Sequence, residues 1–220
     1  MAAHVKSSQP SAFPRRRARA QATRARVLEA ARSLFLEAGY VATTIDAIAE
    51  LADVSPETIY ATFGNKRSLL SGLLDSSIAG GEDAKPILGQ DWVRSMREEP
   101  DARRRLRILT KAGRGILERR AALDEVVRGA ATADPEIAAL RRTGKDQRFA
   151  GQRELVRIAV GPAALRAGLS AAEAADALYA IGSPETYLLL TVDRGWSPAK
   201  FERWYGDSLE RLLLADDLTV

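Results

Sequence analysis

Closely spaced helix start and stop signals between residues 43 and 66 constrain this chain more than any other feature. Thr43 or Thr44 can begin a first short helix, because a hydroxyl there can accept a hydrogen bond from a free backbone N–H of the first turn. The apolar residues that follow share one helical face, at spacings of three and four: Ile45, Ile48, Ala49 and Ala52. Gly64 ends a second short helix and Asn65 caps a third. The segment therefore predicts two short helices joined by a tight turn, followed at once by another helix.

The second short helix has the strongest start signal. Ser55 stands at the N-cap, followed by proline and an acidic residue, and Asp53 is the expected turn residue because Asp tolerates a positive φ. Ile59 and Phe63 are four residues apart and are expected to face the core. The outward face then comprises Pro56, Glu57, Thr58 and Ala61, with Tyr60 near its edge. This is a helix-turn-helix, which typically places its second helix in the DNA major groove, where Glu57 can accept from cytosine N4 or simply stabilise the helix N-terminus.

Lys66 follows the asparagine cap and lies in the first turn of a helix, where a cation opposes the helix dipole. A DNA phosphate against this helix end would reverse that effect, because free N–H groups and the ammonium would bind it together. The alternative is a solvated surface lysine. Beside a helix-turn-helix we favour the phosphate.

The N-terminal segment is basic before it becomes a helix. Residues 1–20 are expected to form a disordered basic arm, rich in Ser, Ala, Pro and Gln at its start, in which Arg15, Arg16 and Arg17 can reach phosphates or the minor groove. The alternatives are a solubilising tail or an arginine-rich targeting segment. Residues 22–38 carry helical apolar spacing and Gly39 stops that helix.

Many of these positions, in this order and spacing, resemble the N-terminal domain of TetR-family transcriptional regulators: Leu28, Ala31, Phe35, Gly39, Tyr40, Thr43, Thr44, Ile48, Ala49, Asp53, Val54, Ser55, Thr58, Ile59, Tyr60, Phe63 and Lys66. The resemblance covers roughly residues 22–72. It implies an all-α fold, with a three-helix DNA-binding domain over residues 21–66 and a helical ligand-binding and dimerisation domain over residues 67–220. It also implies phosphate contacts by Thr44, Tyr60 and Lys66, and base contacts by the outward face of the second helix. The family often has glycine where this chain has Asp53, and larger residues at Ala61 and Thr62. The full set of predicted DNA contacts is Thr43, Thr44, Ser55, Pro56, Glu57, Thr58, Tyr60, Ala61, Lys66, Arg15, Arg16 and Arg17.

Composition excludes several other classes of protein. The chain has no cysteine, and its one histidine, His4, lies in the expected arm, so thiol catalysis, a His-based triad and a multi-His metal site are excluded. We expect no metal and no cofactor. No apolar run reaches the roughly 18 residues of a membrane span, and no secretory signal is present. We therefore expect a cytoplasmic protein that is not an enzyme and has no membrane partner.

Residues after 66 read as further helices. We expect helices over residues 65–78 and 92–97, a long helix from Asp101, another over 121–131, one from Asp134 to Gly161, one from Ser170 to Arg194, and a last one from Ser197. Residues 80–86 form a break rich in glycine. Ser170 and Glu173 have the spacing of a capping box.

The last two helices carry apolar stripes that suggest a homodimer contact built from two helices of each chain. The predicted interface residues are Leu178, Ile181, Leu189, Phe201, Trp204, Leu209 and Leu212. The alternative is that both stripes are used within one monomer. Pro184 lies within one of these helices and predicts a kink, which serves either a ligand pocket or the dimer contact. Four glycines lie within helical patterns, at positions 113, 115, 144 and 151. They either allow helices to pack closely or make the body more flexible, and both alternatives agree with the sequence.

A ligand pocket is implied by the resemblance, between the middle helices. Its predicted residues are Trp92, Met96, Leu109, Ile116, Phe149, Tyr179 and Tyr187, each of which is also a candidate for ordinary core. The leading interpretation is a homodimeric regulator that binds a palindromic double-stranded operator as a repressor and is released by a small-molecule effector. The alternatives are a ligand-independent architectural DNA-binding factor and, third, an enzyme on a helical scaffold.

Overall fold

The chain folds into helices only, over the parts that the structure describes. This computed structural model describes residues 12–80 and 85–215, in which there is no β-strand beyond one isolated bridge between Leu165 and Leu214. The α-helices of this part are α1 (Ala12–Ala42), α2 (Ile45–Ala52), α3 (Pro56–Phe63), α4 (Lys66–Ala79), α5 (Asp91–Glu98), α6 (Ala102–Ala130), α7 (Pro135–Ala159), α8 (Ala171–Ile181), α9 (Pro184–Leu188) and α10 (Pro198–Leu213). Short 3₁₀ turns precede α5 (η1, Ile87–Gly89) and α8 (η2, Pro162–Ala164), and a π-helical turn follows α9 (η3, Leu189–Asp193).

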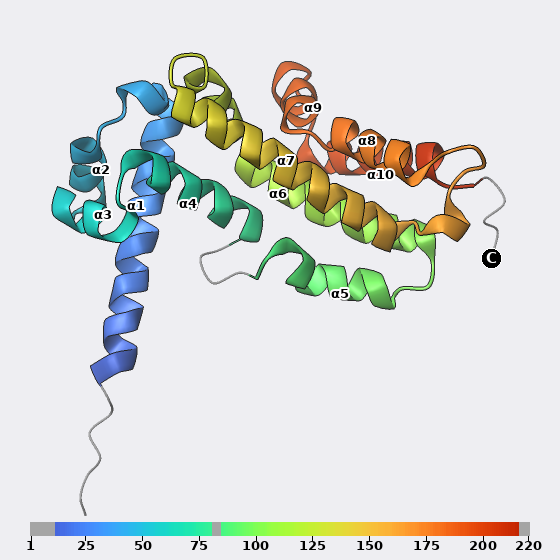
Figure 1. Cartoon of the computed structure of the whole chain (residues 1–220), viewed down its shortest axis with the longest axis horizontal. Helices are drawn as coiled ribbons and strands as arrows, with labels where there is room; N and C mark the ends of the chain where they lie inside the picture. The colour runs from blue at the N-terminus through green and yellow to red at the C-terminus, as the bar shows by residue number, and fades with distance from the viewer. Residues whose placement is uncertain (1–11, 81–84, 216–220) are drawn as a thin grey trace, which may run out of the picture.

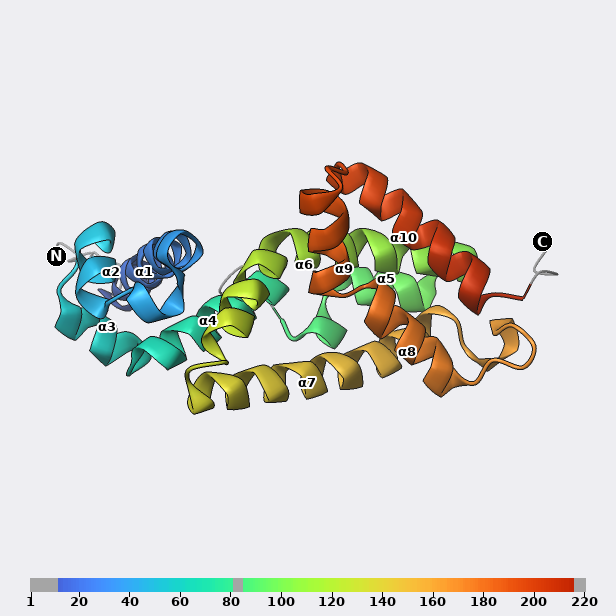
Figure 2. The same cartoon turned by 90° about the horizontal axis from the view of Figure 1, so that it is seen from above.

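The first three helices form one end of an elongated molecule, and α4 leads from them into the body (Figures 1 and 2). Their core is fully closed, with Phe35, Ile48 and Ile59 each 0% exposed. The end of α6 and the start of α7 complete this core through Leu123, Val127, Ala130 and Ile137. The helix-turn-helix is therefore packed directly against the body, rather than joined to it only through α4.

The predicted caps between residues 43 and 66 are confirmed. Thr44, Ser55 and Asn65 each accept a hydrogen bond from the backbone N–H three residues on, at 3.1, 3.3 and 2.8 Å. Asp53 has φ 52°, as expected for the turn residue. Because each cap acts within its own first turn, local sequence was sufficient to place all three helix starts.

The N-terminal expectation needs a correction. Residues 12–20 are helical, so the expected disordered arm over residues 1–20 is not observed in its second part, while residues 1–11, including His4, lie outside the described residues. Gly39, at φ 77° and ψ 169°, breaks the helical path of α1, as the sequence predicted. The basic run of residues 15–19 thus belongs to the first turns of a long helix.

Two predicted boundaries in the body are also wrong. α6 runs unbroken from Ala102 to Ala130, where a boundary near residue 121 was expected. This helix contributes Leu106 and Leu109 to the core of the body and Leu123 and Val127 to the N-terminal core, so contacts along its whole length hold it in one piece.

The second wrong boundary is at Pro184. The helix expected from Ser170 to Arg194 ends at Ile181, and Pro184 starts a new helix with Ser183 as its N-cap. Proline is favourable as the first residue of a helix because it has no N–H to leave unsatisfied there. The two halves are therefore separate helices rather than one kinked helix. Elsewhere, the predicted capping box at Ser170 and Glu173 is present with both of its hydrogen bonds.

Candidate functional site

Helix α3 has one buried face and one open face. Ile59 is 0% exposed and Phe63 is 9% exposed, while Glu57, Ala61 and the 53% exposed Tyr60 lie on the outer surface. In Figure 1, α3 lies at the extreme end of the molecule, away from the body. A helix placed in this way can enter a groove without displacing any other element.

The first turn of α3 is held by short polar side chains. Ser55 Oγ lies 3.2 Å from Thr58 Oγ1 and also accepts from the Thr58 N–H. The pKa of the exposed Glu57 carboxyl lies below its usual value, because its own backbone N–H and the Ser55 hydroxyl hydrogen bond to the charged form. Glu57 therefore presents an acceptor at the helix start, which agrees both with a cytosine contact and with stabilisation of the helix N-terminus.

Two adjacent threonines have different environments. Thr44 is exposed, and its hydroxyl caps α2. Thr43 is 3% exposed, and its hydroxyl donates to the carbonyl oxygens of Gly39 (2.8 Å) and Leu34 (3.1 Å). This placement does not agree with the predicted DNA contact of the Thr43 side chain, because its hydroxyl is already hydrogen-bonded to backbone carbonyls in the last turns of α1.

Lys66 also lies differently from the phosphate contact that was predicted. Its Nζ donates to the carbonyl oxygens of Tyr40 and Thr43, both at 2.8 Å, and lies 4.4 Å from the centre of the Tyr40 ring. Loss of solvent around the ammonium lowers the pKa of Lys66. In this structure the ammonium ties the end of α1 to the start of α4, which corrects the expectation that it is directed at DNA.

The predicted basic arm is represented by the start of α1. Arg16 and Arg17 are exposed, and nothing is described of the Arg15 side chain. Among the α1 side chains that the structure describes, from Arg16 onward, the first buried apolar residue is Val27, so the turns from Arg16 to Val27 extend beyond the core of the domain (Figure 1). Exposed cations therefore project from the same end of the molecule as α3.

The body contains a cavity of about 650 Å³ lined by α4 to α9, with η1 and one residue of α10. Of the seven predicted pocket residues, Trp92, Leu109 and Ile116 line it. Met96 is 0% exposed and belongs to the core, which corrects its assignment. Three aromatic residues were also misassigned, because they pack edge to face against other rings instead of lining the cavity: Phe149 against Tyr179, and Tyr187 against Phe201.

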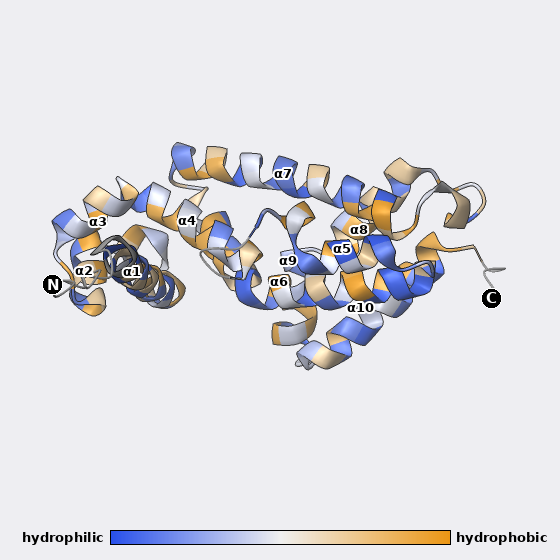
Figure 3. Ribbon diagram, turned by 90° about the horizontal axis from the view of Figure 1, so that it is seen from below, coloured by the Kyte–Doolittle hydropathy of each residue, from blue (hydrophilic) through white to orange (hydrophobic). Residues whose placement is uncertain are grey.

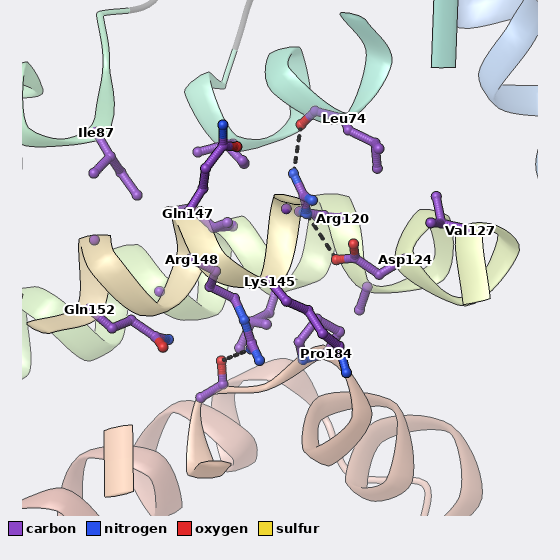
Figure 4. A pocket seen from close by; sticks show the side chains of 18 of the residues that line it. Leu74, Ile87, Arg120, Asp124, Val127, Lys145, Gln147, Arg148, Gln152 and Pro184 are labelled. Atoms are coloured by element: carbon purple, nitrogen blue, oxygen red, sulfur yellow. Dashed lines mark hydrogen bonds and ion pairs between the residues drawn. The ribbon is translucent and has the colours of Figure 1, made fainter. Parts of the chain in front are cut away.

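The polar lining was not predicted from the sequence (Figure 4). Arg120 Nε donates to Asp124 Oδ2 at 2.9 Å, and its Nη1 donates to the Leu74 carbonyl of α4 at 3.2 Å. Arg148 extends from α7 toward α8 and α9, where its guanidinium lies 3.8 Å from the centre of the Tyr179 ring and 3.5 Å from the Gly182 carbonyl oxygen. Pro184 lines the cavity as well, so the break between α8 and α9 contributes directly to its wall.

The residues predicted for a dimer interface fall into two groups. Leu178, Phe201 and Leu209 are at most 1% exposed within one chain, which corrects their assignment because they pack in its own core. Leu189 and Leu212 are 54% and 45% exposed, and Ile181 and Trp204 are half-buried. Val192 of η3, which was not in the predicted set, is 67% exposed. An apolar surface along η3 and α10 thus remains available to a partner.

No helix in the described part of the chain combines the length and the apolar character that crossing a membrane would need.

Comparison with known proteins identifies the N-terminal segment. Residues 27–73 match the family of bacterial regulatory proteins of the tetR type. The regulator TtgR of Pseudomonas putida is 49% identical over 57 residues, which cover 26% of this chain and 27% of TtgR. The chain thus spans about a quarter of the length of this curated relative.

Solved structures extend the likeness to the whole fold. A transcriptional regulator from Saccharomonospora viridis, crystallised with choline, has a TM-score of 0.64 at 24% identity and covers 87% of this chain and 97% of its own. NalD of Pseudomonas aeruginosa, described as the secondary repressor of a multidrug efflux pump, has a TM-score of 0.64 at 22% identity, covering 88% and 97%. Both share the architecture of a helix-turn-helix domain on a helical body. Residues 27–73 thus match the tetR family of bacterial regulatory proteins, and the chain as a whole shares the fold of these solved structures.

Proposed function

We propose that this protein is a TetR-family transcriptional regulator, a cytoplasmic homodimer that binds a specific palindromic DNA operator as a repressor and is released by a small molecule. The observation that carries the proposal is the open face of α3, which presents Glu57, Tyr60 and Ala61 while Ile59 anchors the helix in a closed core. We divide the chain into a DNA-binding part, residues 21–66, and a ligand-binding and dimerisation part, residues 67–220.

The roles of the contact residues follow from exposure and chemistry. Pro56, Glu57, Thr58 and Ala61 of α3 face the bases, with Ser55 shaping the start of the helix. Thr44 and Tyr60 contact phosphates on either side, because both are exposed and carry a hydroxyl. Arg16 and Arg17 add salt-dependent phosphate contacts. Lys66 supports the domain from within.

Dimerisation is supported by the exposed apolar side chains of η3 and α10. Leu189, Val192 and Leu212, together with the half-buried Trp204 and Ile181, are the residues we assign to the contact. One short recognition helix reads few base pairs, whereas two helices about 34 Å apart read two half-sites on one face of the duplex. A symmetric dimer therefore provides the specificity that a single α3 lacks.

Regulation by a small molecule is supported by the cavity and its link to α4. Arg120 lines the cavity and also donates to the Leu74 carbonyl of α4, the helix that follows the helix-turn-helix. A ligand that favours one position of α4 changes the separation of the two α3 helices in a dimer. The change in DNA occupancy is limited by the difference in ligand affinity between the two states. A repressor is the direction supported by NalD, whose description names it as one.

The test is selection of bound sequences from a random DNA pool, with the eluted complex sized at two salt concentrations. A palindromic site held by two chains is the expected result. Salt-sensitive binding without an enriched sequence would support the architectural alternative, and binding by single chains would contradict the dimer.

Once the operator is known, two variants distinguish the contacts to bases from the contacts to phosphates. Thr58→Ala is expected to relax preference at one base position, by about 1 kcal/mol or more. The double change Arg16→Gln with Arg17→Gln is expected to weaken binding to all sequences and lower the salt slope by about two units. Equal behaviour of the two variants on all sequences would refute this division of roles.

A further inference from the structure

The inner face of α7 has an unusual composition for a packed helix. Eight of its residues line the cavity between Leu140 and Leu155, of which Thr143 and Gln147 are exposed. The other six follow at spacings of three and four and share one face of the helix: Arg141, Gly144, Lys145, Arg148, Gly151 and Gln152. We call this set the α7 stripe. Apolar residues flank the stripe at both ends, so apolar packing is interrupted only where the helix faces the cavity. Figure 3 shows blue and white turns along much of this part of α7.

The two glycines of the stripe make the space. An added Cβ at Gly151 would meet no atom within 4 Å, and one at Gly144 would lie 3.9 Å from an Arg120 nitrogen. Glycine disfavours a helix relative to alanine by about 1 kcal/mol per residue. Neither position is close-packed, so the two glycines leave volume next to the cations rather than bringing helices together.

No carboxylate lies within ion-pair distance of the stripe's cations in the part of the chain that the structure describes. Within the described part of the chain, Arg141, Lys145 and Arg148 form no ion pair, although all three are at least partly buried. Among the described residues, the partners of the Arg148 guanidinium are the Tyr179 ring and the Gly182 carbonyl oxygen, the latter at 3.5 Å. Partly buried cations without counter-charges are unfavourable, because desolvation is not repaid by ion pairing.

The acids around the cavity do not balance them. Asp124 is the one acidic lining residue that is not exposed, and it is already paired with Arg120. Asp75, Glu125 and Glu185 lie on the exposed rim, where Glu125 pairs with Arg128 and is also close enough to Arg141 for that charge to lower its pKa. The interior of the cavity therefore has an excess of positive charge.

Much of the remaining lining is apolar, and one buried polar atom of the stripe is open to a ligand. Trp92, Leu109, Ile116, Leu178 and Leu188 provide the apolar wall. The Oε1 atom of Gln152 is buried and has no hydrogen-bond partner among the described residues. A cavity of about 650 Å³ is within the roughly 300–1,000 Å³ range of small-molecule sites.

We infer that the effector is an organic anion with an apolar body, bound with its acidic group against Arg148 and Lys145 of the α7 stripe and its apolar part against the wall formed by α5 and α6. This inference rests on the proposed function, in which a small molecule releases the protein from DNA, and it adds the chemical class of that molecule. The anion supplies the counter-charge that the fold omits. A hydroxyl donor on the same molecule would satisfy Gln152.

The test uses three probes of equal chain length on the full chain: decanoate, 1-decanol and decyltrimethylammonium, measured by calorimetry at fixed salt. We expect decanoate to bind at least ten-fold more tightly than either of the others. Lys145→Gln and Arg148→Gln should each lower decanoate affinity about ten-fold or more, and leave decanol binding unchanged. Arg142→Gln and Arg153→Gln are matched controls, because both arginines are exposed on α7 and do not line the cavity.

Each other outcome contradicts the inference. Equal or tighter binding of the alcohol or the cation would exclude an anionic effector, as would no binding of any probe. Arg148→Gln also removes the contact with Tyr179, and this variant could unfold for that reason. Lys145→Gln breaks no hydrogen bond or ion pair among the described residues, so it tests the anion site even if Arg148→Gln unfolds. Operator selection with the same preparations separates the two proposals: a chain that binds its operator but not decanoate retains the proposed function and loses this inference. A chain that binds decanoate but no operator would retain the anion site and lose the proposed function.

Discussion

The inward faces of α1–α3 and of α7 differ in what they present to their neighbours. In α1–α3 those faces are apolar and closed, with Phe35, Ile48 and Ile59 all fully buried. In α7, no residue from 138 to 154 is buried, and the inner face is made of glycine, cations and one amide. The first arrangement fixes the position of α3, which a DNA-reading helix requires. The second leaves an unfilled, positively charged space. Such a departure from the apolar pattern on an inward face is expected where a chain binds a ligand at some expense of stability, which agrees with the effector site proposed above.

Core truncation tests this contrast with the largest expected effect. Ile48→Ala removes a fully buried side chain from a closed core and should lower the free energy of unfolding by about 2–5 kcal/mol. Ile116→Ala, at the cavity wall, should cost less than half as much, because its side chain already faces open space. Urea unfolding of both variants measures the difference. Equal losses would mean that the cavity wall is packed as tightly as the N-terminal core.

Lys66→Met tests whether the closed N-terminal region depends on an internal cation that ties the end of α1 to the start of α4. The change leaves the carbonyl oxygens of Tyr40 and Thr43 without their charged donor, so we expect a loss of about 1–3 kcal/mol in stability. Lys111→Met, at an exposed position on α6, is the control. Thermal unfolding in the absence of DNA separates the two interpretations of Lys66. An unchanged melting temperature, together with a salt slope for DNA binding lowered by one unit, would restore the phosphate contact.

The sequence predicted the helix-turn-helix well because its signals are local. The caps at Thr44, Ser55 and Asn65 act on residues three positions away, and a period of 3.6 places Ile59 and Phe63 inward. Thr43 and Lys66 were assigned to DNA, but both donate to backbone oxygens near the end of α1. Thr43 donates to Leu34 and Gly39 within the broken helix, and Lys66 donates to Tyr40 and Thr43, 26 and 23 residues before it. A local pattern does not contain that information.

The cavity was only partly predictable for a different reason. Trp92, Leu109 and Ile116 were found because apolar residues of the middle helices are natural pocket candidates. Arg148 and Gln152 were missed because aromatic side chains were preferred to charged ones. The signal was present in the spacing: glycine and cations follow the helical period between Leu140 and Leu155, where apolar residues are expected. Pro184 was read as a kink, whereas the preceding Gly182 and Ser183 allow a full helix stop and restart.

Filling the space beside α7 should stabilise the protein, whereas enlarging a close-packed residue usually destabilises it. Gly151→Leu adds a side chain where nothing lies within 4 Å of the new Cβ, so we expect a gain of about 0.5–1 kcal/mol from helix propensity, together with loss of decanoate binding. Gly182→Ala is the opposite case, because its Cβ would lie 2.3 Å from the hydroxyl oxygen of the buried Tyr205. That variant should be destabilised. Chemical unfolding of the two variants measures whether each change raises or lowers the free energy of unfolding. A destabilised Gly151→Leu would show that the space beside α7 is not open.

The smallest effect concerns the charges of the α7 stripe alone. Lys145 lies four residues after Arg141 and three before Arg148, so it stands between two like charges on one helical face. Like-charge neighbours at these spacings destabilise a helix by about 0.2–0.5 kcal/mol each. Lys145→Gln removes both repulsions and should raise the melting temperature slightly at low salt, with the gain disappearing as salt screens the charges. Arg142→Gln, which removes a cation four residues before Asp146, should instead have no effect or a slight loss. Thermal scans at low and high salt measure both variants. A loss of stability in Lys145→Gln at low salt would mean that an acidic group already neutralises the stripe, and the N-terminal core and the α7 stripe would then differ only in polarity and not in unbalanced charge.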